Sequence, residues 1–246
     1  MDKPLANRIA VVTGASRGIG RAAALALAGT GAHVVALART QGALEELDDE
    51  IRSLGGGATL VPVDLTDFEA IDRLGAALHQ RWGKLDIVIG NAGILGEVAP
   101  LTHVDLKLWD AVLAVNVTAN WRLIRSLDPL LRASEAGRAV FVSSGAAHKC
   151  TAYWGPYSIS KAALEALVRT YAAETVTTPV RAMLVNPGPL RTNMRRAAMP
   201  GEDPMTLKTP EDLAPHLVRL SLPSWTETGK IYDFPRDTVL SPQGPA

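Results

Sequence analysis

Short apolar runs rich in β-branched residues alternate along the chain with segments whose apolar residues recur at helical spacing. A short apolar run between turn residues is typical of a strand that is buried on both faces. The predicted strands are 9–13, 34–38, 59–63, 87–89, 140–142 and 182–185. The predicted helices between and after them are 21–28, 43–54, 68–82, 104–131, 157–175 and 210–221.

This alternation is the pattern of βαβ units, which right-handed crossovers assemble into a parallel sheet with helices on both faces. The predicted fold class is therefore α/β, a single-domain, doubly wound parallel sheet. Pro62 lies inside the third strand and cannot donate to a ladder, so this strand should lie at a sheet edge. The strand order 3-2-1-4-5-6 places it there. We expect a seventh strand near the end of the chain.

No repeat, charge block or flexible linker divides the sequence, so residues 1–234 are predicted to form one domain. Within it, residues 187–209 are irregular and rich in proline, which is typical of a lid. Residues 235–246 are predicted to be an irregular C-terminal tail.

Composition narrows the function classes. The 246 residues include 25 Lys+Arg and 25 Asp+Glu, which gives a formal charge of zero. The composition therefore shows no excess of basic residues that would indicate nucleic-acid binding. No apolar stretch approaches the roughly 20 residues of a membrane helix, and no secretory pattern opens the chain, so we expect a cytoplasmic protein without a membrane partner. The lone Cys150 and five scattered His residues make a metal site unexpected.

Three glycines lie in the turn between the first strand and the first helix. Such a turn exposes backbone N–H groups at a helix N-terminus, which suits a pyrophosphate. The predicted contacts are Gly14, Ser16, Arg17, Gly18, Ile19 and Gly20. The run from Gly14 to Gly18 also matches the G-x-S-x-G elbow of serine hydrolases, with Ser16 as nucleophile. That elbow needs a loop from an earlier strand, and only 13 residues precede Gly14, so a hydrolase is the less favoured alternative.

Six motifs in order resemble the short-chain dehydrogenase/reductase family, which includes the 3-oxoacyl carrier-protein reductases. They are T-G-x-x-x-G-x-G from Thr13, Asn91-Ala92-Gly93, Asn116, Ser144, Tyr157-x-x-x-Lys161 and Asn186-Pro187-Gly188, and the match spans roughly residues 8–233. The resemblance implies a Rossmann-type oxidoreductase that uses a nicotinamide dinucleotide without a metal. Its partner would be a small-molecule carbonyl or alcohol, with a carrier-linked acyl substrate as an alternative.

The proposed chemistry also follows from the residues themselves. Tyr157 and Lys161 share one face of a helix, and a lysine ammonium there should lower the tyrosine pKa from about 10. Tyr157 can then exchange a proton with a substrate oxygen. Ser144 follows a strand at the carboxyl edge of the sheet, where ligands bind, and would hydrogen-bond that oxygen. Ser143 is its local rival, and the family spacing favours Ser144.

The resemblance implies further roles. Lys161 would hold the nicotinamide ribose hydroxyls, and Asn116 would join a water-linked proton path to Lys161. The other implied cofactor contacts are Asp64 to adenine, Asn91, Ala92 and Gly93 near the ribose, and Pro187, Gly188, Leu190 and Thr192 near the nicotinamide. Gly90 departs from the family, which usually has a second Asn there. Cys150, Tyr153 and Trp154 are candidates to line the substrate pocket.

The end of the second strand indicates the cofactor. Enzymes that prefer NAD place an acidic residue there for the ribose 2′-hydroxyl, whereas this chain has Ala38 followed by Arg39. Arg39 and Arg17 could converge on a 2′-phosphate, so the sequence predicts NADP(H). Arg195 and Arg196 begin the predicted lid, where a solvated lid surface is the favoured interpretation and contact with an acidic substrate or carrier is the alternative.

The sequence thus predicts an NADP(H)-dependent oxidoreductase that moves a hydride between the nicotinamide and a carbonyl or secondary alcohol. The alternative is a catalytically silent NADP-binding sensor or scaffold, which the intact Asn-Ser-Tyr-Lys set disfavours. By resemblance, helices 104–131 and 157–175 would form a homodimer, with a homotetramer as the alternative. Family members commonly end in a strand followed by Asp-Gly-Gly. Residues 228–235 of this chain do not have that ending, which weakens the case for the tetramer.

Overall fold

Parallel strands form the centre of the structure, a computed structural model that describes residues 3–242. The described strands make one sheet in the order β3-β2-β1-β4-β5-β6-β7-β8, which is parallel except for the antiparallel pair β7–β8. The strands are β1 Ile9–Thr13, β2 His33–Ala38, β3 Gly57–Pro62, β4 Ile87–Gly90, β5 Arg138–Val142, β6 Arg181–Asn186, β7 Ile231–Asp233 and β8 Thr238–Leu240. The predicted fold class is therefore confirmed.

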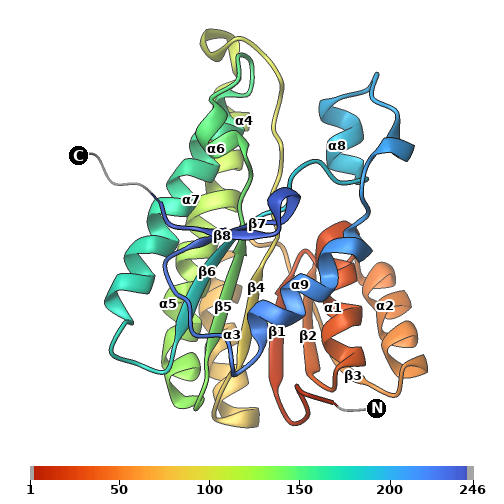
Figure 1. Cartoon of the computed structure of the whole chain (residues 1–246), viewed down its shortest axis with the longest axis vertical. Coiled ribbons are helices and arrows are strands. Elements are labelled where there is room, and N and C mark those ends of the chain that lie inside the picture. The colour runs from red at the N-terminus through yellow and green to blue at the C-terminus, as the bar shows by residue number, and fades with distance from the viewer. Residues whose placement is uncertain (1–2, 243–246) are drawn as a thin grey trace.

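Helices cover both faces of the sheet (Figure 1). One face carries α1 Gly18–Gly29, α2 Gln41–Ser53 and α9 Pro210–Ser221, and the other carries α3 Phe68–Trp82, α5 Ala119–Ala133 and α7 Gly155–Glu174. Each helix layer closes its own apolar cluster against the alternating side chains of the strands. The short helices α4 Leu106–Leu113, α6 Ala146–Lys149 and α8 Asn193–Ala198 follow later strands at one end of the sheet.

The edge position of the third strand follows from Pro62, as predicted. β3 lies at one end of the strand order, and Pro62 pairs with Ala38 at the last position of the β2–β3 ladder. The next residue, Val63, donates its N–H to the Ala38 carbonyl at 2.9 Å. Because Pro62 faces no further strand, its missing N–H leaves no gap in the sheet.

The prediction of one helix over 104–131 is wrong. α4 ends at Leu113, a π-helical turn occupies Ala114–Thr118, and α5 then begins at Ala119. A π turn changes the hydrogen-bond pattern without breaking the helical course, so the apolar spacing on its two sides gives no signal of it. π turns are rare and occur frequently at functional sites. This one carries Asn116.

The C-terminal region also differs from the sequence prediction. The expected seventh strand is present as β7, but the tail predicted to be irregular contains a 3₁₀ turn at Phe234–Arg236 and then β8. Asp237, at φ +46°, reverses the chain, and its carboxylate accepts a hydrogen bond of 2.7 Å from the Tyr232 hydroxyl. A contact between residues five apart thus fixes the hairpin. Residues 243–246 of the predicted tail lie outside the described residues.

Gly90, where the family usually has a second Asn, lies under an aromatic ring. It pairs with Phe141 of β5, and a Cβ at Gly90 would lie 2.2 Å from Phe141 Cδ1. Phe141 is 1% exposed, so the ring has little room to move. The bulk that a side chain at position 90 would supply comes here from the neighbouring strand.

We expect Gly90→Ala to destabilise the fold, because overpacking a closed core costs about 1–3 kcal/mol. Gly42→Ala is the matched control, since Gly42 lies in α2 with nothing within 4 Å of the added Cβ. Alanine in a helix gains about 0.5–1 kcal/mol over glycine. Urea unfolding of both variants measures the two changes. Equal unfolding free energies for Gly90→Ala and the unchanged protein would show that Phe141 shifts at no cost.

Candidate active site

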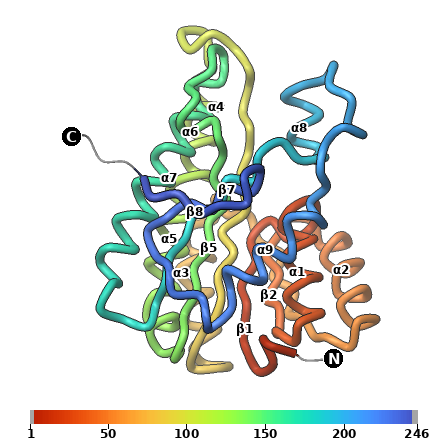
Figure 2. The backbone as a smooth tube through the Cα atoms, in the orientation of Figure 1, coloured from red at the N-terminus to blue at the C-terminus, as the bar shows by residue number. Residues whose placement is uncertain are grey.

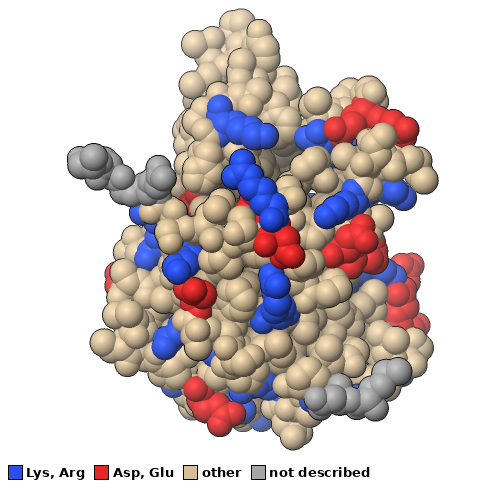
Figure 3. Space-filling model, in the orientation of Figure 1, with Lys and Arg blue, Asp and Glu red and all other residues tan. Residues whose placement is uncertain are grey.

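The motif residues gather at the carboxyl ends of the parallel strands. Figure 2 shows the chain rising there on two sides, as the loop after β4 with α4 and α6 on one side, and as α8 with its flanking turns on the other. On the face shown in Figure 3, basic and acidic side chains are interspersed among uncharged residues. No helix within residues 3–242 is long and apolar enough to cross a membrane. Over the same residues no group of three or more His, Cys, Asp or Glu could hold a metal ion.

The glycine turn packs tightly against the loop that follows β4. Gly14 and Gly18 have φ of +65° and +56°, and a Cβ at Gly20 would lie 2.3 Å from the Gly14 carbonyl oxygen. The Asn91 side-chain amide donates to the Thr13 carbonyl at 2.9 Å. In return, Thr13 Oγ1 accepts the backbone N–H groups of Asn91 and Ala92, each at 3.0 Å. The ends of β1 and β4 are thereby locked together.

The start of α1 offers unused donors. Arg17 is the N-cap residue, in extended conformation, and no side chain caps the helix. The first N–H groups of a helix have no partner within the helix and lie at the positive end of its dipole. In front of Gly18, the nearest atom to an added Cβ would be Thr192 Cγ2 at 3.7 Å. The turn therefore fits a phosphate group. Ser16 and Ile19, also predicted contacts, are half-buried there.

The residues predicted to select the cofactor are Arg39, which follows β2, and Arg17, the N-cap residue of α1. The side chains of Arg17 and Arg39 are exposed, and Arg39 approaches Asp64 at 3.9 Å. Asp64 accepts hydrogen bonds of 2.8 Å from the Thr66 backbone and hydroxyl, and the backbone bond is the main cause of its lowered pKa. An exposed pair at this distance holds Arg39 weakly. The guanidinium is thus available to a ligand at little cost.

Tyr157 stands near the start of α7 and is 9% exposed. Burial raises its pKa above the usual 10, and a hydrogen bond with Ser144 opposes that shift only in part. The expectation that Lys161 lowers the tyrosine pKa is therefore wrong, because desolvation of the phenolate dominates. The Lys161 Nζ lies 5.7 Å from the centre of the Tyr157 ring. The Trp154 ring packs edge-on against Tyr157 with centroids 6.1 Å apart.

Lys161 is a buried cation at 3% exposure. Its Nζ donates to the Val142 carbonyl at 2.8 Å. Burial lowers its pKa to about 8, although the carboxylate of Glu165 acts in the opposite direction. The ammonium therefore lies close to its own titration at neutral pH.

The two neighbouring serines have different partners. Ser143 is 1% exposed, and its hydroxyl donates to Glu165 Oε1 at 2.6 Å. Ser144 is half-buried and accepts the Ala146 N–H at 3.2 Å, and its hydroxyl lies near enough to Tyr157 to lower the pKa of that tyrosine. The structure thus brings Ser144, and not its rival, to the tyrosine.

Asn116 is fully buried in the π turn. Its Oδ1 accepts the Ile94 N–H at 2.8 Å, and its Nδ2 donates to the Ile94 carbonyl and to Ser160 Oγ, both at 2.9 Å. A Cβ at Gly93 would lie 3.2 Å from Asn116 Oδ1 and 3.6 Å from Lys161 Nζ. Asn116 and Lys161 therefore approach each other over a position that only glycine fits comfortably.

The segment after β6 turns sharply toward the site. The Asn186 side chain donates to the Asp233 carboxylate of β7 at 2.5 Å. Gly188 has a φ of +65°, and a Cβ added there would lie 2.4 Å from Pro235 Cγ. Pro187 and Leu190 are buried, and Leu190 bridges to Lys208. The Thr192 hydroxyl accepts the Arg195 N–H at 3.1 Å and caps α8. The returning chain thus holds Thr192 against the glycine turn.

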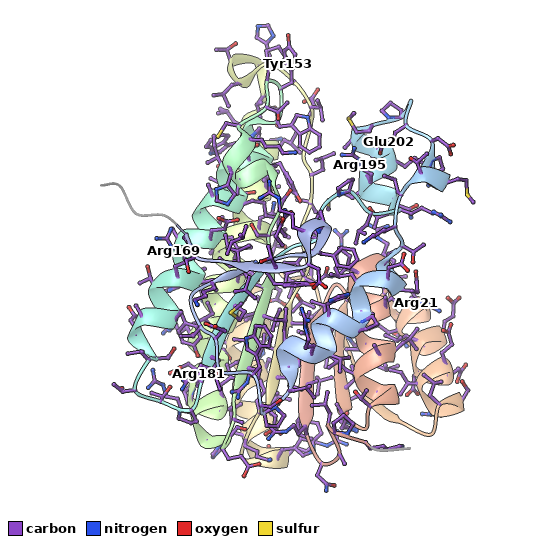
Figure 4. The ribbon with its side chains drawn as sticks, viewed as in Figure 1. Arg21, Tyr153, Arg169, Arg181, Arg195 and Glu202 are labelled. Carbon is purple, nitrogen blue, oxygen red and sulfur yellow. The ribbon has the colours of Figure 1, made fainter. Side chains whose placement is uncertain are left out.

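The lid arginines are engaged within their own segment. Arg195 forms two hydrogen bonds of 2.6 Å with the Glu202 carboxylate (Figure 4), and Arg196 donates to Asn193 at 2.9 Å. The carboxylate raises the pKa of Arg195, and the pKa of Glu202 is lowered in turn. Arg195 is therefore already neutralised. This pairing disfavours the alternative in which Arg195 meets an acidic substrate.

Sequence reasoning overlooked two side chains that organise the site, Thr13 and Glu165. Thr13 ends β1 and joins it to the loop after β4, a link between residues 78 apart. Glu165 lies four residues after Lys161 and eight after Tyr157. That repeated spacing of four places the three on one helix face and could have shown Glu165.

Comparisons with known proteins agree with this geometry. A family model described as short chain dehydrogenase matches residues 8–203. The uncharacterized oxidoreductase YciK of Escherichia coli (strain K12) is 37% identical over 233 residues, covering 93% of this chain and 92% of YciK. A short chain dehydrogenase structure from Shigella flexneri 2a, complexed with NADP, has a TM-score of 0.91 at 37% identity and covers 95% of this chain and 99% of its own. A Mycobacterium tuberculosis protein named as an uncharacterized NAD-dependent oxidoreductase is 36% identical over 204 residues, 77% of this chain and 74% of that protein.

Proposed function

This chain belongs to the short-chain dehydrogenase/reductase family, and on that premise we propose that it is an NADP(H)-dependent reductase or dehydrogenase of a carbonyl or secondary alcohol. The observation that carries the proposal is the placement of the buried Tyr157 and Lys161 on one helix, with the lysine Nζ 5.7 Å from the centre of the tyrosine ring and Ser144 near enough to the phenol to lower its pKa. A hydroxyl pair beside a buried cation is suited to bind and protonate a carbonyl oxygen.

Each side chain has a distinct task. When bound, the nicotinamide supplies or accepts the hydride at the substrate carbon. In reduction, Tyr157 donates its phenol proton to the carbonyl oxygen, and its raised pKa keeps that proton in place at neutral pH. Ser144 hydrogen-bonds the same oxygen. Lys161, with a pKa of about 8, can return a proton to the tyrosine, and Asn116 supports this path from across Gly93.

The cofactor would lie across the ends of β1, β4 and β6. The glycine turn, from Gly14 to Gly20 and including Ser16, Arg17, Gly18 and Ile19, would hold the pyrophosphate. Asp64 would bind the adenine, and Asn91, Ala92 and Gly93 would lie along the ribose with Tyr157 and Lys161. Pro187, Gly188, Leu190 and Thr192 would contact the nicotinamide.

Residues 187–209 would act as the lid over a small-molecule carbonyl or alcohol. The internal pairing of Arg195 with Glu202 supports an uncharged group at this part of the entrance. A carrier-linked acyl substrate stays a prediction from the sequence.

The preference for NADP(H) over NAD(H) rests on Arg39 and Arg17. No acidic side chain occupies the end of β2, where Ala38 is followed by the weakly held Arg39. The solved Shigella flexneri relative is complexed with NADP, which supports the same choice. Because another relative is named NAD-dependent, these local residues and not family membership must decide the preference.

We expect Tyr157→Phe to lower turnover by about 10²- to 10⁴-fold, because the ring stays while the proton donor is lost. Cofactor affinity should change little. Tyr171→Phe is the matched control, since it makes the same change on the same helix, where the Tyr171 hydroxyl donates to Asp128 at 2.8 Å, and should keep full turnover. The assay follows NADPH absorbance over a panel of carbonyl compounds.

Undiminished turnover in Tyr157→Phe would remove Tyr157 from the mechanism. If the unchanged protein binds NADPH tightly yet reduces no compound of a broad panel, the silent sensor or scaffold becomes the better hypothesis. Fluorophosphonate labelling of Ser16 would favour the hydrolase. Against it, residues 3–8 form only a turn and its flanks before β1, so no earlier described strand supplies the loop that an elbow needs.

Arg39→Ala should weaken NADPH binding by about 10- to 150-fold, since a charge-assisted hydrogen bond contributes roughly 1.5–3 kcal/mol. NADH binding should be nearly unchanged. Arg73→Ala is the control, because its side chain, like that of Arg39, is 66% exposed and forms one surface ion pair. Fluorescence titration of both cofactors measures the four affinities. Equal losses for NADPH and NADH would show that Arg39 does not bind the 2′-phosphate.

We also propose a homodimer formed through α5 and α7. Trp121 and Ile159 on these helices are 44% and 40% exposed, which suits a contact surface. Light scattering at micromolar concentration should give twice the chain mass of 26.1 kDa. Trp121→Glu should shift that mass toward the monomer. A monomeric mass for the unchanged protein would exclude the dimer, and four times the chain mass would indicate the tetramer.

A further inference from the structure

Glu165 is a buried carboxylate that the proposed chemistry leaves without a role. It lies on α7, one turn after Lys161 and two turns after Tyr157, and is 5% exposed. Burying a charged group is costly unless hydrogen bonds and opposite charge compensate it. An uncharged side chain would be buried there at a lower cost in free energy. The contacts of Glu165 therefore suggest a role for its charge.

Two side chains in polar contact with the Glu165 carboxylate flank Ser144. The Ser143 hydroxyl donates to Oε1 at 2.6 Å, and His148 Nε2 lies 2.9 Å from Oε2. Ser143 comes one residue before Ser144 and His148 four residues after it. One carboxylate therefore ties both ends of this short segment to the helix that carries Tyr157.

The adjoining residue of the same strand is bound by Lys161. Its Nζ donates to the carbonyl of Val142, the residue before Ser143. The backbone N–H of Ser143 in turn donates to the Val185 carbonyl of β6 at 2.8 Å. The exit of β5 is thus fixed by two charged side chains of α7 and by the neighbouring strand, and Ser144 is the first residue beyond these contacts.

The charges around Glu165 are few. Lys161 precedes it on α7, and Arg169, one turn later, is exposed. From α6 come His148, in contact, and the exposed Lys149. At this point β5 presents the neutral Ser143, β6 has no charged residue over 182–186, and the π turn has none over 114–118. Lys107 and Asp110 of α4 are exposed. The carboxylate therefore acts chiefly on Lys161 and His148.

We propose that Glu165 is a positioning residue of the active site, which fixes the segment carrying Ser144 through Ser143 and His148 and which holds the charge of Lys161 by its own. The proposal rests on the proposed oxidoreductase function. It predicts two separable effects. The contacts with Ser143 and His148 depend on the shape of the Glu165 side chain, whereas the effect on Lys161 depends on its charge.

The charge effect has a defined sign. Burial lowers the pKa of Lys161 to about 8, and the Glu165 carboxylate raises it against that trend. Removing the negative charge must therefore lower the Lys161 pKa further. The lysine then loses its proton at a lower pH. As the pH rises, the rate of any step that needs the ammonium therefore begins to fall at a lower pH.

Glu165→Gln tests this effect, because it keeps the shape and an acceptor for Ser143. We expect the alkaline limb of the kcat/KM profile for carbonyl reduction to move to lower pH by about one unit, while kcat at lower pH is kept. The Lys161 Cε resonance, assigned by its loss in Lys161→Arg, should show the same shift in the protein without cofactor. Glu174→Gln is the control, because Glu174 is exposed at the end of the same helix.

The positioning effect is tested by shortening the side chain. Glu165→Ala should lower kcat about tenfold or more across the whole pH range, with NADPH affinity nearly unchanged. Ser143→Ala removes one of the two anchors and should lower kcat several-fold, which keeps the test open if Glu165→Ala does not fold. The double variant should cost no more than Glu165→Ala alone, because both changes remove the same hydrogen bond.

The proposal is overturned if Glu165→Gln leaves both the pH profile and the Lys161 titration unchanged, or if Glu165→Ala and Ser143→Ala keep full turnover. Such results leave the proposed function intact as long as Tyr157→Phe is inactive. If the unchanged protein shows no reductase activity, the proposed function fails. The Lys161 titration still decides the charge effect in that case, because it needs no substrate.

Discussion

The hydrogen bond from the Lys161 ammonium to the Val142 carbonyl holds the centre of this structure together. It places a charge among buried groups, where solvation is poor, at the point where β5 ends and the segment carrying Ser144 begins. Three features of the surroundings accompany this buried charge. The pKa of the lysine falls to about 8, Glu165 approaches from the next turn of α7, and Gly93 keeps its side free of a Cβ. Burying the Lys161 charge costs free energy, and the hydrogen bond that it makes fixes the positions of Tyr157 and Ser144.

A second constraint acts beside β1, where the order of the strands along the sheet reverses. β1 lies between β2 and β4, so the chain leaves β1 on one side of the sheet and β4 on the other, which is where open α/β sheets bind ligands. Thr13 and Asn91 close this crevice at its base by their mutual hydrogen bonds. The glycine turn then has a fixed floor, and its N–H groups face outward.

The proposed lid, residues 187–209, is held differently. Its strongest contacts, between Arg195 and Glu202, lie within the segment itself, while Leu190 and Thr192 provide its connection to the core. A segment organised in this way can keep its own shape while its position over the site changes. On the side of residues 187–209, substrate choice would then depend on uncharged groups, since Arg195 is already paired with Glu202.

The sequence by itself determined the strand order, the edge position of Pro62 and the glycine turn, because these depend on local spacing and on simple rules of strand and turn chemistry, while the resemblance to a family singled out Tyr157 and Lys161. Only the tertiary structure decided the π turn at Asn116, the strand β8, the contact of Ser143 with Glu165, and the direction of the Tyr157 pKa shift. Each of these depends on burial or on contacts between residues far apart in the chain, such as Ser143 with Glu165. Desolvation in particular has no signature in a local sequence pattern, since it is set by whatever the rest of the fold places around a group.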